Sequence, residues 1–295
     1  MRHLLLVVSL AATLQVSAQG IITNVLGRNT FSLNGKWNYI IDPYETGYYD
    51  YRYEPYDKNP NPSGGYFLDK HAQNKSELLE YDFDKCPTLM VPKDWNSQDA
   101  RLLYYEGTIW YRRLFDYKKS NPANRVFVYF GAANYETDVY LNGKKLGKHI
   151  GGFTPFTYEI TSLLKDEKNS LVVKVDNKRK REGVPTLNTD WWNYGGITRD
   201  VMIVELPVTF ISDYFIQLKK GSKNLITGYV RLDGIDKNQK IKIEIPELKT
   251  VAEFTTDKNG VADISIPVKK YEAWSPASPK LYQVNVSCET DKVSE

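Results

Sequence analysis

The sequence predicts an all-β protein built from two successive β-sandwiches. Residues 241–245 alternate strictly between isoleucine and charged side chains, which is the period-two pattern of a strand with one wet face. Residues 126–130 are all β-branched or aromatic, as expected of a strand in a sandwich core. No segment keeps a helical period for more than about two turns. Together these observations favour the all-β class.

Two short sequences between strand-like runs predict hairpins. Asn142-Gly143 follows the run 137–141, and both positions of such a two-residue turn require a positive φ, which Asn and Gly adopt readily. The second turn, residues 257–260, is also flanked by strand-like runs and ends in Asn-Gly. We therefore expect one hairpin at each of these turns.

The boundary between the two predicted sandwiches falls near Leu206-Pro207. The strand-like runs before it fill about the length of a jelly-roll sandwich. The shorter runs after it, punctuated by prolines, fit a smaller immunoglobulin-like sandwich. We therefore expect a jelly-roll domain over residues 19–207 and an immunoglobulin-like domain over residues 208–295. Neither part shows the alternating strand–helix pattern of a (β/α)₈ barrel.

The first 18 residues have the features of a secretory signal peptide. Arg2 and His3 precede the apolar run 4–14, and the short residues 16–18 provide a cleavage site before Gln19. No later stretch reaches the roughly 18 apolar residues that a transmembrane helix needs. We expect a soluble mature chain that is exported to the periplasm or the extracellular space.

Composition and charge argue against several classes of protein. The 39 basic and 36 acidic residues give a formal charge of +3, which is too balanced to indicate a nucleic-acid partner. The three histidines, one of which is His3, provide little material for a zinc site or a Ser-His-Asp triad. Cys86 and Cys288 are the only cysteines, and two single thiols are favoured over a disulfide. We expect no metal, no cofactor, no nucleic acid and no membrane partner.

A tyrosine-rich stretch lies between Asp42 and Tyr66. Two interpretations are open for it. It is either a long surface loop that packs on itself, or an aromatic loop at a cleft or subunit contact, where tyrosine offers contact area at low entropic cost. Its tyrosines are Tyr44, Tyr48, Tyr49, Tyr51, Tyr53 and Tyr56.

Several motifs occur in order along the chain. They are Trp110-Tyr111-Arg112-Arg113, Asp138 to Gly143, Gly151 to Phe156, and Asp190 to Val201. Together they resemble the sugar-binding sandwich of glycoside hydrolase family 2, and the last resembles the signature at the end of that sandwich. The stretch from Trp274 to Tyr282 is similar to part of the family's second, immunoglobulin-like domain. The order of several motifs makes the resemblance specific, whereas each motif alone would be weak.

The resemblance implies a retaining exo-β-glycosidase of the β-glucuronidase or β-galactosidase type. Enzymes of this family use two glutamates on a barrel, about 5 Å apart, and a covalent glycosyl-enzyme intermediate. The family's acid/base follows an asparagine, and no asparagine here is followed by glutamate. The resemblance therefore implies a non-catalytic N-terminal portion with no catalytic residue of its own. Its implied partners are a β-glycoside and a downstream catalytic barrel, and a homo-oligomer is compatible with it.

The resemblance also implies a sugar contact by Asp190. In the family an aspartate at this position projects from the sandwich toward the sugar, where a carboxylate can accept strong hydrogen bonds from hydroxyls. The alternative is a turn aspartate that bonds its own backbone. Trp191 and Trp192 would line the same substrate-binding site, although we expect one of them to lie in the core. Arg199 and Asp200 are expected to form a structural ion pair.

The sequence leaves alternatives open for the substrate and for the class of function. Residues 193–197 are nearer the β-glucuronidase form of the signature, so glucuronides are favoured and galactosides come next. The basic run 178–181 is either a solvated face or an attractant for an anionic glycan such as a uronide. Because sandwich domains host many functions, a stand-alone secreted carbohydrate-binding protein of two β-sandwiches is the alternative to a portion of a glycosidase.

Overall fold

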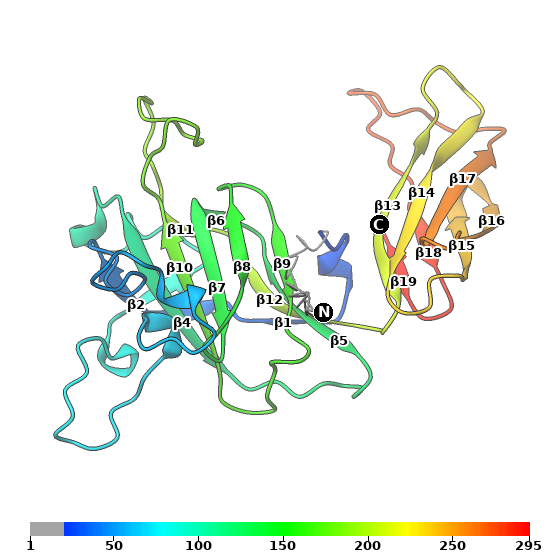
Figure 1. Cartoon of the computed structure of the whole chain (residues 1–295). Helices are drawn as coiled ribbons and strands as arrows, with labels where there is room; N and C mark the ends of the chain where they lie inside the picture. The colour runs from blue at the N-terminus through cyan, green and yellow to red at the C-terminus, as the bar shows by residue number, and fades with distance from the viewer. Residues whose placement is uncertain (1–20) are drawn as a thin grey trace, which may run out of the picture.

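The chain folds into two β-sandwiches that follow one another along the sequence (Figure 1). The computed structural model describes residues 21–295, so the predicted signal peptide lies outside the described residues. Within this range the helical structure consists of six 3₁₀ turns of three residues each. The predicted all-β class is therefore confirmed. No helix between residues 21 and 295 has the length and apolar character needed to cross a membrane.

The first sandwich packs a six-stranded sheet against a four-stranded sheet, and neighbouring strands are antiparallel throughout. In spatial order the larger sheet contains β3 (Thr88–Val91), β2 (Gly35–Asp42), β4 (Thr108–Phe115), β10 (Asn169–Asp176), β7 (Glu136–Leu141) and β8 (Lys144–Ile150). The smaller sheet contains β1 (Thr30–Ser32), β12 (Val201–Leu206), β5 (Arg125–Phe130) and β9 (Phe156–Glu159). A separate short ladder joins β6 (Ala133–Asn134) to β11 (Gly196–Ile197).

The predicted core strand is β5. Val126, Val128 and Phe130 point into the main core between the two sheets. Phe127 points to the opposite face, where it packs with Phe210 in a second apolar cluster. Both faces of this strand are buried, which explains why its sequence lacks polar alternation.

The hairpin predicted at Asn142-Gly143 is confirmed. It joins β7 to β8, and the two residues have φ angles of 51° and 79°. The side chain of Asn142 also donates to the carbonyl oxygen of Leu163 at 2.8 Å. The turn chemistry and the surrounding structure therefore favour the same conformation.

The second sandwich packs a three-stranded sheet against a four-stranded sheet. The smaller sheet contains β13 (Phe210–Leu218), β14 (Leu225–Asp233) and β17 (Val261–Pro267). The larger contains β16 (Thr250–Thr255), β15 (Lys240–Ile245), β18 (Asn285–Ser287) and β19 (Lys292–Ser294). The alternation predicted for 241–245 is confirmed, because Ile241, Ile243 and Ile245 of β15 are buried in one core.

The hairpin predicted at residues 257–260 is wrong. The strands on either side of this turn belong to different sheets, because β16 pairs with β15 and β17 pairs with β14. The Asp257 carboxylate accepts hydrogen bonds from the backbone of Asn259 and of Val261, both at 2.9 Å. The turn itself is therefore well formed, but it carries the chain from one sheet to the other.

The segment before β1 ties the two sandwiches together. Arg28 forms an ion pair with Asp291 of the second sandwich at 2.9 Å, and both side chains are nearly buried. The backbone N–H of Thr23 donates to the carbonyl oxygen of Ser212 at 3.1 Å. Cys86 and Cys288 lie in different sandwiches, are half-buried, and form no disulfide.

The tyrosine-rich stretch packs on the outer face of the six-stranded sheet. Asp42, at the end of β2, accepts hydrogen bonds from the backbone of Thr46 and Gly47 and from the Trp110 indole, each at 2.9 Å. These bonds fix the start of the stretch to the sheet. Phe67 then stacks on Tyr140 of β7 with ring centroids 4.5 Å apart. Within the stretch, the ring centroids of Tyr48 and Tyr49 lie 4.8 Å apart. The stretch therefore covers part of one face of the sheet and also packs on itself.

Candidate functional site

Asp190, Trp191 and Trp192 lie on a long loop at one end of the first sandwich. The loop spans residues 177–195 between β10 and β11 and rises above these strands in Figure 1. Because β4 is antiparallel to β10, the residues just before β4 reach the same end of the sheet. This arrangement brings Tyr104 and Glu106 next to the loop.

Buried asparagines fix the root of the loop. Asn193 donates to the carbonyl oxygen of Asn177 at 2.6 Å, and Asn177 returns a bond to the carbonyl oxygen of Asn193 at 3.0 Å. Asn96 accepts a bond from the backbone N–H of Gly195 at 2.9 Å. Asn134 donates to Asn193 at 3.4 Å. The amide oxygen of Asn134 has no partner among the described residues, but the other hydrogen bonds of this buried network hold the root of the loop in place.

The loop and its neighbours enclose a cavity of about 220 Å³, which we call the loop cavity. Its lining residues are Asn96, Tyr104, Tyr105, Glu106, Arg179, Asp190, Trp191, Trp192 and Asn193. The Trp192 ring stacks against Tyr104 with centroids 5.2 Å apart, and against Tyr194 at 6.3 Å. The structure thus brings all three predicted site residues to one cavity.

Neither tryptophan lies in the core, contrary to the prediction for one of them. Trp191 is 66% exposed and Trp192 is 39% exposed. The loop root is already filled by asparagines and by Trp95, so no indole of the loop is needed there. Two exposed indoles on a fixed loop form the kind of apolar wall that a ligand can stack on.

The Asp190 carboxylate is exposed and accepts no hydrogen bond from any residue that the structure describes. It therefore does not cap its own turn, which was the alternative interpretation. Its oxygens remain available to donors on a ligand. A sugar offers such donors as hydroxyl groups.

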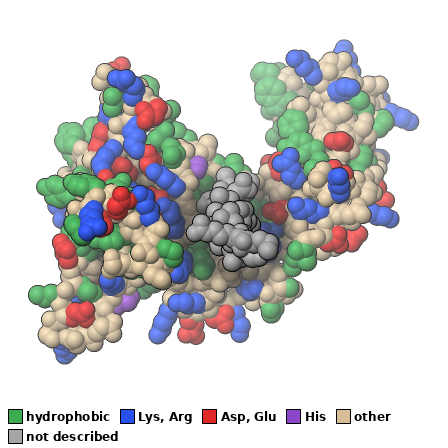
Figure 2. Space-filling model, viewed as in Figure 1, with side chains coloured by type: hydrophobic (Ala, Val, Ile, Leu, Met, Phe, Trp, Pro, Cys, Tyr) green, Lys and Arg blue, Asp and Glu red, His purple; other side chains and the backbone are tan. Residues whose placement is uncertain are grey.

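The basic run 178–181 is largely neutralised by glutamates. Lys178 pairs with Glu45 at 2.9 Å, Arg179 pairs with Glu106 at 2.9 Å, and Lys180 pairs with Glu136. Burial alone would raise the pKa of Glu45, but the hydrogen bond from Lys178 and the charge of Lys174 hold that pKa below its ordinary value. Figure 2 shows acidic and basic side chains interspersed over the visible face. The run is therefore part of a paired surface.

Two further predictions concern groups near the site. Arg199 and Asp200 do not form the expected ion pair, because Asp200 accepts from Asn34 at 2.8 Å and Arg199 donates to the carbonyl oxygen of Phe153 at 3.3 Å. Among residues 21–295 no group of three or more His, Cys, Asp or Glu is placed to hold a metal ion.

Comparison with known families identifies the chain. The model of the glycosyl hydrolases family 2 sugar binding domain matches residues 31–207, and a second model of glycosyl hydrolases family 2 matches residues 209–295. The chain belongs to glycosyl hydrolase family 2. The loop cavity is therefore part of this family's sugar-binding domain.

Relatives in the family include glucuronidases and galactosidases. A β-glucuronidase of Bacteroides fragilis is 36% identical over 48% of this chain and 22% of its own length. A β-galactosidase of Thermoanaerobacter pseudethanolicus is 29% identical over 72% of this chain and 31% of its own length. The chain thus spans a third or less of the length of these curated relatives.

Solved structures of the family have the same fold. A β-glucuronidase of an uncultured Clostridium species superposes with a TM-score of 0.70 at 23% identity, over 91% of this chain and 44% of its own. The Bifidobacterium dentium β-glucuronidase complexed with coumarin-3-O-glucuronide also gives a TM-score of 0.70, at 22% identity over 91% of this chain and 48% of its own. The two-sandwich architecture is therefore shared with part of each of these longer structures.

Sequence reasoning missed Tyr104, Glu106 and the asparagine network. The sequence contained a signal for Tyr104 and Glu106. They lie just before the strand that carries the Trp110 motif, and the strand that pairs with it leads into the loop. The asparagines carried no such signal, since Asn96, Asn134 and Asn177 come from three distant segments. Their function depends on where the fold places them.

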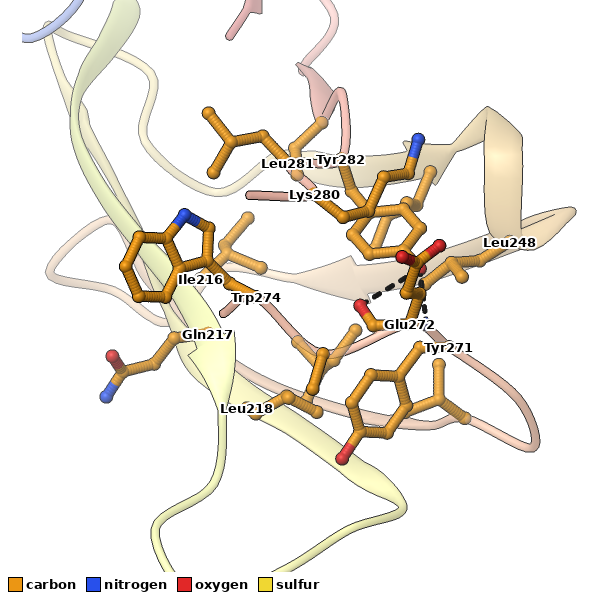
Figure 3. Close-up of a pocket in the computed structure, with 15 residues that line it drawn as sticks. Ile216, Gln217, Leu218, Leu248, Tyr271, Glu272, Trp274, Lys280, Leu281 and Tyr282 are labelled. Carbon is orange, nitrogen blue, oxygen red and sulfur yellow. Dashed lines mark hydrogen bonds between the residues drawn. The ribbon is translucent and has the colours of Figure 1, made fainter. Parts of the chain in front are cut away.

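The second sandwich has a larger hollow of about 350 Å³, which we call the end hollow (Figure 3). Its lining includes Ile216, Leu218 and Leu248, together with Trp274 and Leu281. In Figure 3 Trp274 lies next to Ile216, opposite Leu248. The carboxylate of Glu272, at its rim, accepts a hydrogen bond from Ser278. This lining is mainly apolar and offers less to a polyhydroxylated ligand than the loop cavity does.

Proposed function

We propose that this chain is the sugar-binding, non-catalytic N-terminal portion of an exported, retaining exo-β-glycosidase. Family membership and the partial coverage of longer relatives support the proposal. The absence of an Asn-Glu pair in the sequence supports it as well. In this proposal a downstream barrel carries the two catalytic glutamates.

One observation carries the role of the loop cavity. The Asp190 carboxylate has no partner among the described residues and lies beside the exposed Trp192 indole, on a loop whose root is fixed. A carboxylate accepts hydroxyl hydrogen bonds, and an indole face packs on the C–H face of a pyranose ring. In our proposal Asp190 therefore holds sugar hydroxyls, while Trp191 and Trp192 form the wall.

A β-glucuronide is our favoured substrate, and a β-galactoside comes next. The relatives with these names and the form of residues 193–197 support this order. The loop cavity does not add a strong preference for an anion, because Glu106 already neutralises Arg179. Selection of a uronide carboxylate would then fall to groups on the barrel.

The test is made on a longer form of the protein that includes the barrel. Asp190→Asn preserves the shape of the side chain but removes its charge. Losing a charge-assisted hydrogen bond of about 1.5–3 kcal/mol should lower kcat/KM for nitrophenyl β-glucuronide about tenfold to hundredfold. Glu182→Gln, an exposed acid on the same loop outside the cavity, is the matched control.

Three outcomes would contradict the proposal. Normal kinetics of Asp190→Asn with lowered thermal stability would remove Asp190 from the site. Hydrolysis of nitrophenyl β-glucuronide by the pure 295-residue chain would contradict the non-catalytic assignment. A coding sequence without a barrel after Glu295 would instead favour a stand-alone carbohydrate-binding protein. Release of a mature N-terminus near Gln19 on expression would support export.

A further inference from the structure

The tyrosine-rich stretch contributes to a second cavity in the first sandwich, which we call the insertion cavity. It measures about 240 Å³ and lies on the outer face of the six-stranded sheet, whereas the loop cavity lies at the strand ends. The rings of Tyr56, Tyr66, Tyr81 and Phe83 contribute to its wall. It shares no lining residue with the loop cavity.

The floor of the insertion cavity is fixed by the sheet beneath it. Tyr66 packs on Trp110 of β4 with ring centroids 5.6 Å apart, and on Tyr81 at 4.1 Å. The Tyr66 hydroxyl lies 3.1 Å from the Thr46 hydroxyl. Burial raises the pKa of Tyr66 far above its ordinary value, so its hydroxyl stays neutral. The cavity is therefore formed before any ligand binds, which reduces the entropic cost of binding.

Several polar groups of the cavity remain open to a ligand. The hydroxyl of Tyr56 and the carboxylate of Glu80 make no hydrogen bond within the described part of the chain. Lys70 uses one of its three donors on the carbonyl oxygen of Ser63 at 3.2 Å. The cavity thus offers donors and acceptors next to aromatic rings.

Two acids and one base line the cavity, so it has no excess of positive charge. Glu80 and Lys70 at the rim have opposite signs. Asp69 pairs with Arg112 at 3.0 Å, although Arg112 also pairs with Asp84 at 2.6 Å. Asp69 also accepts a hydrogen bond from Ser170 at 2.6 Å. An anionic ligand would therefore gain little here. A neutral ligand with several hydroxyl groups can use every open polar group without leaving a charge unpaired.

From these observations we infer that the insertion cavity binds one neutral sugar unit of a glycan, at a site separate from the loop cavity. The volume lies below the roughly 300 Å³ at which pockets for drug-sized ligands begin, so it suits a single ring. The tyrosine rings pack on the C–H face of that ring, while Tyr56 and Glu80 hold its hydroxyls.

The experiment measures binding by the full 295-residue chain and requires no catalysis. The chain is run on native gels that contain a soluble neutral β-glucan, a neutral β-galactan or polygalacturonate, and its retardation gives an apparent Kd. Tyr81→Ala removes one ring, and Glu80→Ala removes an exposed carboxylate without touching the core. Tyr51→Ala, a largely exposed tyrosine of the same stretch outside the cavity, is the matched control.

We expect retardation by at least one neutral glycan. Tyr81→Ala and Glu80→Ala should each weaken binding about tenfold, whereas Tyr51→Ala should bind like the parent chain. Thermal unfolding of each variant checks that the fold is retained. The Asp190→Asn variant should still bind the neutral glycan at the insertion cavity, and adding Tyr81→Ala should weaken that binding.

Three results would overturn the inference. The first is no retardation by either neutral glycan. The second is retardation by polygalacturonate alone, since it would show a preference for anions. The third is glycan binding that is lost in Asp190→Asn but kept in Glu80→Ala. This result would assign the binding to the loop cavity, and the proposed function would still stand. Conversely, a failure of Asp190→Asn to affect catalysis would leave the insertion cavity untouched.

Discussion

The two sandwiches each carry a hollow beside the ends of their strands, and the two hollows differ in how they are built. The loop cavity rests on buried asparagines and presents a carboxylate without a protein partner next to exposed indoles. The end hollow is larger, but its wall is mainly apolar and Glu272 accepts from Ser278. The two hollows therefore differ less in volume than in polar groups that are free to bind a ligand. Such groups are what a sugar site requires and a gap in packing lacks.

The difference extends to what stabilises each sandwich. The first sandwich buries hydrogen-bonded polar groups, including Glu205, which accepts bonds from Ser120, Asn124 and Tyr117. The second buries fewer polar side chains, among them Gln239 and Thr256, beside a core made mainly of isoleucine and valine. The three predictions below test this contrast, from the largest expected effect to the smallest. Five of the six tryptophans lie in the first sandwich, so fluorescence mainly reports that sandwich.

The largest effect is expected for Gly195→Ala at the root of the loop. A Cβ atom there would collide with the Trp95 ring and lie 2.6 Å from the amide nitrogen of Asn177. Such overpacking should lower the free energy of unfolding of the first sandwich by about 3 kcal/mol. Denaturant titration followed by tryptophan fluorescence measures the change.

The control for this variant lies on the same loop. Gly183→Ala places a Cβ no closer than 3.3 Å to its nearest neighbour, at a backbone conformation that alanine adopts. Its free energy of unfolding should fall by less than about 1 kcal/mol. Equal losses for the two glycines would show that the loop root is not the rigid part of the site.

A smaller effect is expected from acid, and it should fall on the first sandwich. Burial alone would raise the pKa of Glu205, but hydrogen bonds from Ser120, Tyr117 and Asn124 lower it from 4.5 to about 2. A carboxylate with a lowered pKa stabilises the fold above its unfolded pKa. That stability, about 2 kcal/mol, is lost as the pH falls from 4.5 toward 2.

Glu205→Gln separates this carboxylate from all others. The variant should be less stable than the parent at neutral pH, and its stability should decline less between pH 4.5 and pH 2. Denaturant titrations at several pH values measure how the free energy of unfolding of each protein changes with pH. Parallel declines in the two proteins would mean that other carboxylates cause the loss.

The smallest effect is expected for Trp274→Ala at the end hollow. The side chain is 59% exposed, so its removal should cost only about 1 kcal/mol of the unfolding free energy of the second sandwich. Binding of neutral glycans by the 295-residue chain should not change, because both proposed sugar sites lie in the first sandwich. A loss of glycan binding in this variant would move carbohydrate recognition to the end hollow.

Local patterns in the sequence were sufficient for part of this structure. The alternation of residues 241–245 placed three isoleucines in one core, and Asn142-Gly143 formed its hairpin, because side-chain period and turn conformation depend on neighbours in the chain. The ordered motifs around Trp110 and Asp190 led to the correct family. They also drew attention to the segment that lines the loop cavity.

Only the tertiary structure decided which distant groups meet. The turn at 257–260 has the hydrogen bonds of a well-formed turn. The strands before and after it nevertheless belong to different sheets, because strand pairing depends on which side chains the whole domain buries. For the same reason both loop tryptophans are exposed, and Lys178 and Arg179 meet Glu45 and Glu106. Residues that are neighbours in the sequence determine turn conformation and side-chain period. The pairing of strands and the burial of side chains depend on residues far apart in the chain, because the free energy of burial comes from contacts among all of them.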